Sequence, residues 1–482
     1  MVRRLRLAQA LQRRLEDGLV SASGDRILEL AGFAANLAWM AHGGAFALPS
    51  VERALKEGPG LEGGRPRLNP ASVEGRTLHV LTTAYETGGH TRLAQRWMEL
   101  MHPEPCAVVL VDQREPVAAD WVVPSGGGIP LLDFEREGIR SRLDKVATLL
   151  ALMQSARRVV FHIHPDDAVS VAAGHQARGV DLCFLNHADH VAWLGASLPA
   201  LLLGGRRGGN ELAVHRRGID PAMCGYVPLP LTEPIQMDRG EARKSLGIGE
   251  AEVVLLTLAS GYKYLPVEGR SLLEPLSLVL RNPGHRLIAI GPDPEHPVFT
   301  ELARRHPGRV QALGIIRKPD LYRAAADIYI DSFPFCSTTS LLENILIGTP
   351  VVAFQPDPDE LGIFYSDWPN LPGSLFGSPD PEGFAERVEA LAESRARRLE
   401  VGGRLRKAVE IHLSEPWRES MLTLQKSAFT PRPWSGRVPV EEGILDRTLA
   451  GLGRDPFRYP RLSKWPLGFL EKVGVGLDRL RG

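Results

Sequence analysis

The chain has 482 residues, enough for two or three domains with large cores. Its 57 basic residues balance 57 acidic ones, so no global field favours a nucleic-acid partner or an acidic membrane surface. Four scattered cysteines include no CxxC pair, which favours a reducing, cytoplasmic compartment. The content of arginine, 49 glycines and 38 prolines suggests a GC-rich bacterial genome.

The first 75 residues predict a helical extension followed by a linker. Apolar residues recur at three- and four-residue steps from Leu5 to Leu19, as on one face of a helix. Charged residues interrupt this stretch, so it is no signal peptide, and the apolar stretch 27–49 is too broken for a transmembrane helix. Residues 57–75 are rich in glycine, proline and charge, which indicates a linker.

From residue 77 onwards, short apolar strands alternate with helical patterns in two successive blocks. Such alternation is typical of βαβ units in parallel sheets, so we expect an α/β protein with two doubly wound, Rossmann-like domains. The first domain is predicted at 76–230 and the second at 231–413, with a proline-spaced crossing over 227–234. Residues 414–482 are predicted to form a helix and a tail that packs back on the first domain, and peripheral membrane contact through the tail is an alternative.

The segment 327–354 is the most informative part of the chain. A buried strand is followed by the hydroxyl cluster Ser337, Thr338, Thr339 and Ser340, a helical pattern, Gly348 and another strand. The hydroxyls fall where the helix begins, and free N–H groups and the helix dipole make that end an anion site. Serine and threonine are also ordinary helix caps. Glu343 lies one turn further on and could reach a ribose diol beside the anion, which together would indicate a nucleotide.

This segment resembles the donor-binding half of GT-B glycosyltransferases, and its hydroxyl-rich turn is most similar to the O-GlcNAc transferase-like branch. The resemblance covers roughly residues 77–425 and implies two domains that face a cleft. It also implies a nucleotide-diphospho-sugar donor, expected to be UDP-linked, with no cofactor or metal. Many retaining members carry a glutamate eight residues before the ribose glutamate, where this chain has Phe335.

Two further turns in the second block match the same resemblance. Lys263, in the run Tyr-Lys-x-x-Pro, follows the first strand of this block, where a lysine can neutralise a departing diphosphate. In the family, the loop that includes Ile316 and Arg317 lies on the nucleotide base, although Arg317 could equally be a solvated helix flank.

In the first block, the turn Gly88-Gly89-His90 follows the first strand. The two glycines would let the backbone approach the donor closely. Many inverting GT-B enzymes have a catalytic histidine at this turn, and a near-neutral pKa suits His90 to deprotonate an acceptor. Retaining relatives also have a Gly-Gly turn here.

A group of polar residues follows two later strands of the first block. His162, His164, Asp166 and Asp167 could ligate zinc, as in a metallohydrolase. We favour acceptor-side roles for four residues, which are His164, His187, Asp189 and His190.

These features together predict an inverting glycosyltransferase that moves a sugar from a nucleotide-diphospho-sugar to an acceptor hydroxyl or amide. A sugar-nucleotide epimerase of the same fold and a catalytically inactive GT-B-like subunit are the alternatives. The sequence identifies neither the sugar nor the acceptor, which could be a protein, a glycan or a small molecule.

Overall fold

The computed structural model describes residues 2–85, 89–124, 128–426 and 429–452. The chain forms two compact units. Of these described residues, unit 1 contains those up to 204, 210–225 and 429–452, and unit 2 contains 205–209 and 226–426. None of the helices in these described ranges is long and apolar enough to cross a membrane.

Unit 1 is built on a seven-stranded sheet with the order β3-β2-β1-β4-β5-β6-β7. Neighbouring strands from β3 to β6 pair in parallel. The first strand, β1, lies inside the sheet; β2 and β3 are added on one side of it, and β4 and the later strands on the other. The boundary between β1 and β4 is therefore the switch point of a doubly wound fold. The strands are β1 (Thr77–Leu81), β2 (Cys106–Leu110), β3 (Leu131–Asp133), β4 (Arg158–His162), β5 (Asp181–Leu185), β6 (Leu201–Gly204) and β7 (Cys224–Tyr226).

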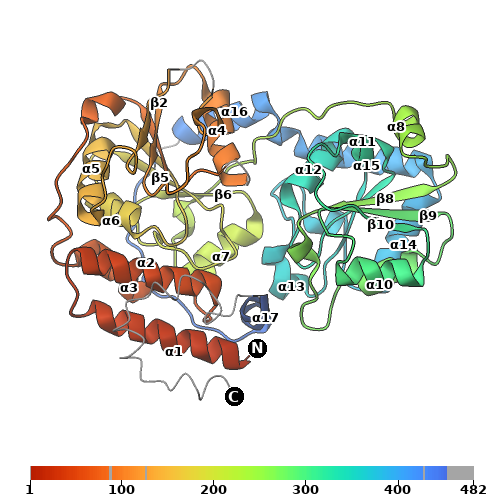
Figure 1. Ribbon diagram of the computed structural model, residues 1–482, viewed down its shortest axis with the longest axis horizontal. Coiled ribbons are helices and arrows are strands. Elements are labelled where there is room, and N and C mark those ends of the chain that lie inside the picture. The colour runs from red at the N-terminus through yellow and green to blue at the C-terminus, as the bar shows by residue number, and fades with distance from the viewer. Residues whose placement is uncertain (1, 86–88, 125–127, 427–428, 453–482) are drawn as a thin grey trace. The chain divides into compact units, whose positions relative to one another are not determined.

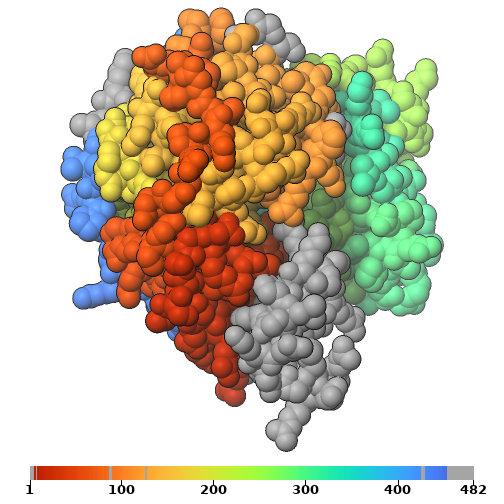
Figure 2. All heavy atoms as spheres, turned by 60° about the vertical axis from the view of Figure 1, so that its left-hand side comes forward, coloured from red at the N-terminus to blue at the C-terminus, as the bar shows by residue number. Residues whose placement is uncertain are grey.

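Helices cover this sheet, and an additional helical layer from the N-terminus packs against them (Figure 1). The helices are α1 (Val2–Leu19), α2 (Asp25–Met40), α3 (Pro49–Glu57), α4 (Gly89–Met101), α5 (Arg142–Ser155), α6 (Ala168–Gln176), α7 (Arg207–Arg217) and α17 (Ile444–Leu452). Helices α2 and α3 contact α6, and α1 contacts α17. Figure 2 shows the N-terminal helices (red) and the 140–180 segment (yellow-orange) joined in one continuous surface.

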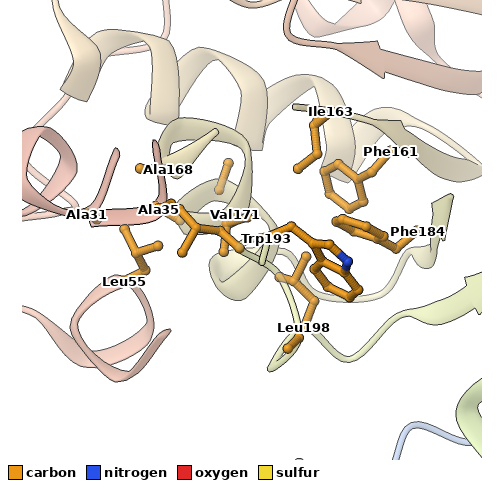
Figure 3. Close-up of a cluster of buried hydrophobic side chains, with 14 of the residues drawn as sticks. Ala31, Ala35, Leu55, Phe161, Ile163, Ala168, Val171, Phe184, Trp193 and Leu198 are labelled. Atoms are coloured by element: carbon orange, nitrogen blue, oxygen red, sulfur yellow. The ribbon is translucent and has the colours of Figure 1, made fainter. Parts of the chain in front are cut away.

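The N-terminal helices share one apolar core with the sheet of unit 1. Ala31, Ala35 and Leu55 from α2 and α3 lie beside Val171 of α6 (Figure 3). Figure 3 also shows Trp193, which stacks on Phe184 of β5 with ring centroids 4.7 Å apart. Burial of a large side chain such as Leu55 or Val171 contributes about 1.5–3 kcal/mol, so the extension is an integral part of unit 1.

Two buried carboxylates connect distant segments of unit 1. Glu52 of α3 is fully buried and accepts hydrogen bonds from the backbone N–H groups of Gly195 (2.7 Å) and Ala196 (3.1 Å). Asp446 of α17 accepts from Arg216 at 2.7 Å and lies 2.8 Å from His42 Nε2. A buried carboxylate without such partners would destabilise the folded state. These contacts therefore hold α3 and α17 in place against the rest of unit 1.

Unit 2 is a fully parallel six-stranded sheet with the order β10-β9-β8-β11-β12-β13. Its switch point lies between β8 and β11. The strands are β8 (Val253–Leu258), β9 (His285–Ile290), β10 (Val310–Ala312), β11 (Ile328–Ile330), β12 (Val351–Phe354) and β13 (Gly377–Ser378).

Helices of unit 2 lie on both faces of this sheet (Figure 1). They are α8 (Arg239–Ser245), α9 (Leu273–Val279), α10 (Pro297–Arg305), α11 (Asp320–Ala325), α12 (Thr338–Ile347), α13 (Pro358–Leu361), α14 (Pro381–Ala392) and α15 (Arg395–Val409). Helix α16 (Ser414–Lys426) follows at the end of the unit. Helix α12 ends at Gly348, whose φ of 96° suits the left-handed conformation of a C-terminal glycine.

The structure differs from the sequence prediction in two local respects. Helix α4 begins at Gly89, so His90 lies in the first turn of a helix and not in the preceding turn. Helix α7 was not predicted from the sequence, because its glycine-rich start at Arg207 hides the helical period.

Candidate functional site

In unit 2, the lysine and the hydroxyl cluster predicted from the sequence meet at the switch point of the sheet. Lys263 lies in the 3-10 turn Gly261–Tyr264 that follows β8, and the loop 331–337 follows β11. The Lys263 ammonium donates a hydrogen bond to the Cys336 carbonyl at 2.7 Å. A positive charge therefore lies beside Cys336, two residues before the start of α12, at the edge of the sheet where doubly wound folds bind ligands.

The start of α12 is held by a buried carboxylate that the sequence reasoning missed. Asp331 accepts hydrogen bonds from the Ser337 backbone N–H (2.9 Å) and hydroxyl (2.8 Å), and from the Ser332 N–H. Burial raises the pKa of Asp331 above its ordinary value. The sequence feature that could have identified Asp331 is its position directly after the apolar strand β11.

This arrangement shows that the Ser337 hydroxyl does not cap α12. Ser337 is the N-cap residue, but among the described atoms its side chain makes no capping hydrogen bond to α12, because its hydroxyl donates to Asp331. Thr338 is half-buried, Thr339 is exposed and Ser340 is half-buried. The positive end of α12 is thus left for another hydrogen-bond acceptor.

Glu343, the residue that the resemblance assigns to the ribose, forms an ion pair with Arg323 of α11. The Glu343 side chain is one-third exposed (33%), whereas Arg323 is largely buried (10%). Arg323 also lies 3.7 Å from Asp320. The sequence reasoning missed Arg323, since a lone arginine in a short helix carries no pattern.

The loop after β10 is fixed by backbone hydrogen bonds. The Gly314 N–H donates to Pro292 O at 2.9 Å, and its carbonyl accepts from Gly291 at 2.7 Å. Gly291, with a φ of 107°, approaches Ala259 so closely that a Cβ atom would lie 2.0 Å from the Ala259 carbonyl oxygen. Ile316 packs against the core, and Arg317 is exposed.

Phe335 occupies an aromatic environment. Its ring contacts Tyr262 at 6.2 Å and Phe364 at 4.9 Å between centroids. Tyr262 itself is 59% exposed. The residue in the position of the second glutamate is therefore part of a packed aromatic cluster beside Lys263.

In unit 1, three predicted histidines come together after β1, β4 and β5, at and beside the switch point. The His90 ring stacks on that of His187 at 5.6 Å and meets that of His164 edge-on at 5.4 Å. Tyr85 stacks on His164 at 5.7 Å and completes the histidine cluster, which we define as Tyr85, His90, His164 and His187. Gly89 is the first residue of α4, and Gly88 lies outside the described residues.

Hydrogen bonding defines the tautomer of His90. Its Nε2 lies 2.9 Å from the Thr83 carbonyl oxygen, an acceptor, so Nε2 carries the proton and Nδ1 keeps the free electron pair. Burial lowers the pKa of His90, and the bond to Thr83 opposes this shift only in part. Burial, reinforced by the neighbouring His90 and His164, also lowers the pKa of His187 to about 3. Both rings are therefore neutral at neutral pH.

His162 is separated from this cluster and belongs to the core. It is fully buried, and its Nε2 lies 3.0 Å from Nδ1 of His79 on the adjacent strand β1. Trp97 of α4 meets both rings edge-on. No group of three or more histidine, cysteine or acidic side chains in the described ranges is arranged to hold a metal ion.

The last two acceptor-side candidates pair with each other. His190 Nδ1 lies 3.4 Å from the carboxylate of Asp189, which is buried. The Asp189 carbonyl oxygen accepts a hydrogen bond from Arg217 at 2.7 Å. Arg217 lies over the Trp193 ring at 4.7 Å, so this segment is anchored in the core of unit 1.

Comparison with known proteins identifies the fold. Neither protein-family models nor curated proteins match the sequence. Among solved structures, a glycosyltransferase from Rickettsia africae ESF-5 has a TM-score of 0.53 at 10% identity and covers 73% of this chain and 97% of its own. HepE from Anabaena in complex with UDP and glucose (TM-score 0.50, 14% identity) and the lipopolysaccharide outer core galactosyltransferase WaaB (0.50, 14%) cover 73% of this chain and 100% of their own. The chain therefore has the GT-B fold of glycosyltransferases.

Proposed function

We propose that this protein is an inverting glycosyltransferase that transfers a sugar from a UDP-sugar to a hydroxyl or amide of an acceptor. The observation that carries the proposal is the hydrogen bond between Lys263 and Cys336 O, two residues before the start of α12, which has no side-chain cap. A fixed ammonium beside a helix N-terminus suits the two negative charges of a diphosphate. HepE, a protein of the same fold, was solved with UDP bound.

In the proposed reaction, the acceptor oxygen loses its proton to Nδ1 of His90 and attacks the anomeric carbon. The bond between that carbon and the diphosphate oxygen breaks, and its electron pair leaves with UDP. Lys263 and the N–H groups of α12 stabilise the charge that develops on the leaving diphosphate. This division of roles requires no metal ion.

Glu343 is proposed to hold the ribose. Its ion pair with Arg323 orients the carboxylate. Donor binding would add ribose hydroxyls as hydrogen-bond donors to the exposed part of this carboxylate.

Two sequence features support inversion and the choice of branch. Phe335 removes the carboxylate that many retaining relatives use, and it is packed between Tyr262 and Phe364. The run Tyr262-Lys263-x-x-Pro266 and the hydroxyl cluster favour the O-GlcNAc transferase-like branch. We place acceptor contacts at His164 and His187, which share the histidine cluster with His90.

The test is a panel of nucleotide-sugars with and without EDTA. We expect one UDP-sugar to be consumed with release of UDP, and EDTA to have no effect. NMR of the glycosylated product should show an inverted anomeric configuration. Retention of configuration would refute the assigned base, an epimerised donor without UDP release would indicate an epimerase, and loss of activity in EDTA would refute the metal-independent chemistry.

A further inference from the structure

Unit 2 contains a second pocket at the edge of the sheet opposite to the candidate donor site. The pocket has a volume of about 220 Å³ and includes Asp327 and Pro350, which directly precede β11 and β12. In a parallel sheet the amino ends of the strands share one edge and the carboxyl ends share the other. The pocket therefore does not belong to the site around Lys263.

Four arginines line this pocket, which are Arg239, Arg323, Arg395 and Arg398. Arg323 is engaged with acidic residues outside the pocket. Two of the others contact the carboxylate of Asp327, Arg239 at 2.6 Å and Arg398 at 3.5 Å.

Asp327 also pairs with a third arginine, which does not line the pocket. Arg243, which is buried, contacts Asp327 at 3.0 Å, so one carboxylate serves three guanidinium groups. Burial lowers the pKa of Arg398, and the neighbouring charges of Arg239, Arg395 and Arg243 lower it further, against the influence of Asp327. Arg395 is exposed and has no ion pair within the described part of the chain. Positive charge in the pocket is therefore undercompensated.

The same pocket has an apolar rim. Ile235, Met237 and Leu399 line it and are 67%, 43% and 64% exposed. Large apolar side chains with this exposure gain about 25 cal/mol per Å² when an apolar group covers them. Arginines beside an exposed apolar rim are complementary to an amphiphilic anion.

We infer that this pocket binds a phosphate ester with an apolar chain, held by Arg239, Arg395 and Arg398 at the head and by Ile235, Met237 and Leu399 along the chain. The shared chemistry is an alkyl phosphate, whether a soluble molecule or a lipid headgroup supplies it. This site is independent of the proposed glycosyl transfer, because no sugar nucleotide takes part in it.

The test is calorimetry of the full-length protein with hexyl phosphate and with inorganic phosphate. We expect one site for hexyl phosphate, with affinity at least about tenfold higher than for inorganic phosphate because the chain covers the apolar rim. Arg395→Ala should weaken hexyl phosphate binding about ten- to hundredfold, while Arg304→Ala, an exposed arginine on α10 of the same unit, should leave it unchanged. Leu399→Ser should abolish the preference for hexyl phosphate, with Leu422→Ser, an exposed leucine on α16, as its control.

Three results would overturn the inference: equal affinity for both phosphates, an unchanged affinity in Arg395→Ala, or displacement of hexyl phosphate by UDP. The last result would move the ligand to the donor site. Sedimentation with phosphatidylcholine vesicles, with and without phosphatidic acid, distinguishes the two sources. Binding only to vesicles with phosphatidic acid, lost in Arg395→Ala, assigns a lipid, and hexyl phosphate binding without vesicle binding assigns a soluble phosphate ester.

Discussion

Replacement of Lys263 by alanine tests the candidate donor site most directly. The substitution removes a half-buried ammonium that donates to Cys336 O at 2.7 Å beside the start of α12. If this ammonium also contacts a diphosphate, its loss should weaken UDP binding and slow the step in which the diphosphate leaves.

The expected magnitudes follow from that geometry. A hydrogen bond to a charged group contributes about 1.5–3 kcal/mol, so the Kd for UDP should rise about 10- to 150-fold. The effect on kcat should be about 10²–10³-fold, because charge on the leaving oxygen is greatest in the transition state. The fold should lose at most about 1.5–3 kcal/mol of stability, since the one hydrogen bond from this ammonium to a backbone carbonyl disappears.

Calorimetry with UDP and UMP separates the diphosphate contact from other causes. UMP lacks the second phosphate, so Lys263→Ala should leave its affinity nearly unchanged. Lys244→Ala, an exposed lysine on α8 of the same unit, should alter neither affinity. Equal weakening of UDP and UMP, or unchanged UDP binding, would refute the assignment of Lys263 to the diphosphate.

Three other predictions concern the remaining groups. His90→Ala should lower kcat about 10²–10⁴-fold with unchanged UDP affinity, and a rate close to wild type would exclude His90 as the base. Because burial lowers the pKa of His90, the wild-type kcat/KM should fall with decreasing pH only below about 6.5. Glu343→Ala should weaken UDP by about 1–3 kcal/mol and remove the difference between UDP and 2′-deoxy-UDP, and a difference that persists would place the ribose elsewhere. Burial lowers the pKa values of His79 and His187 to about 3 and of His412 to about 4, so the folded state excludes protons that the unfolded state binds below pH 6.5. Stability should therefore be complete above pH 6.5 and fall by about 1.4 kcal/mol per histidine for each pH unit towards 4, and denaturant titrations that show no loss by pH 5 would contradict this.

The sequence by itself determined the fold class and much of one candidate site. Strands buried on both faces are continuous apolar runs, so β8 and β11 were predictable from local pattern alone. In a doubly wound sheet, the residues that follow such strands lie at one edge, and this rule brings Lys263 close to Ser337 without any side-chain coordinates. Gly348 was equally predictable as the end of α12, because glycine readily adopts the left-handed backbone conformation that ends a helix.

Only the tertiary structure decided which partners these residues have. Three contacts illustrate this: Asp331 with Ser337, Arg323 with Glu343, and the ring of His90 on that of His187. Each contact joins residues that are separate in the sequence and sets the direction of a side chain that the sequence leaves open. The separation of His162 from His164 also required coordinates, because their spacing fits both a metal pair and a core residue beside a surface one. Pair contacts of this kind depend on long-range packing and side-chain direction, whereas sequence periodicity reports only which face of an element is buried.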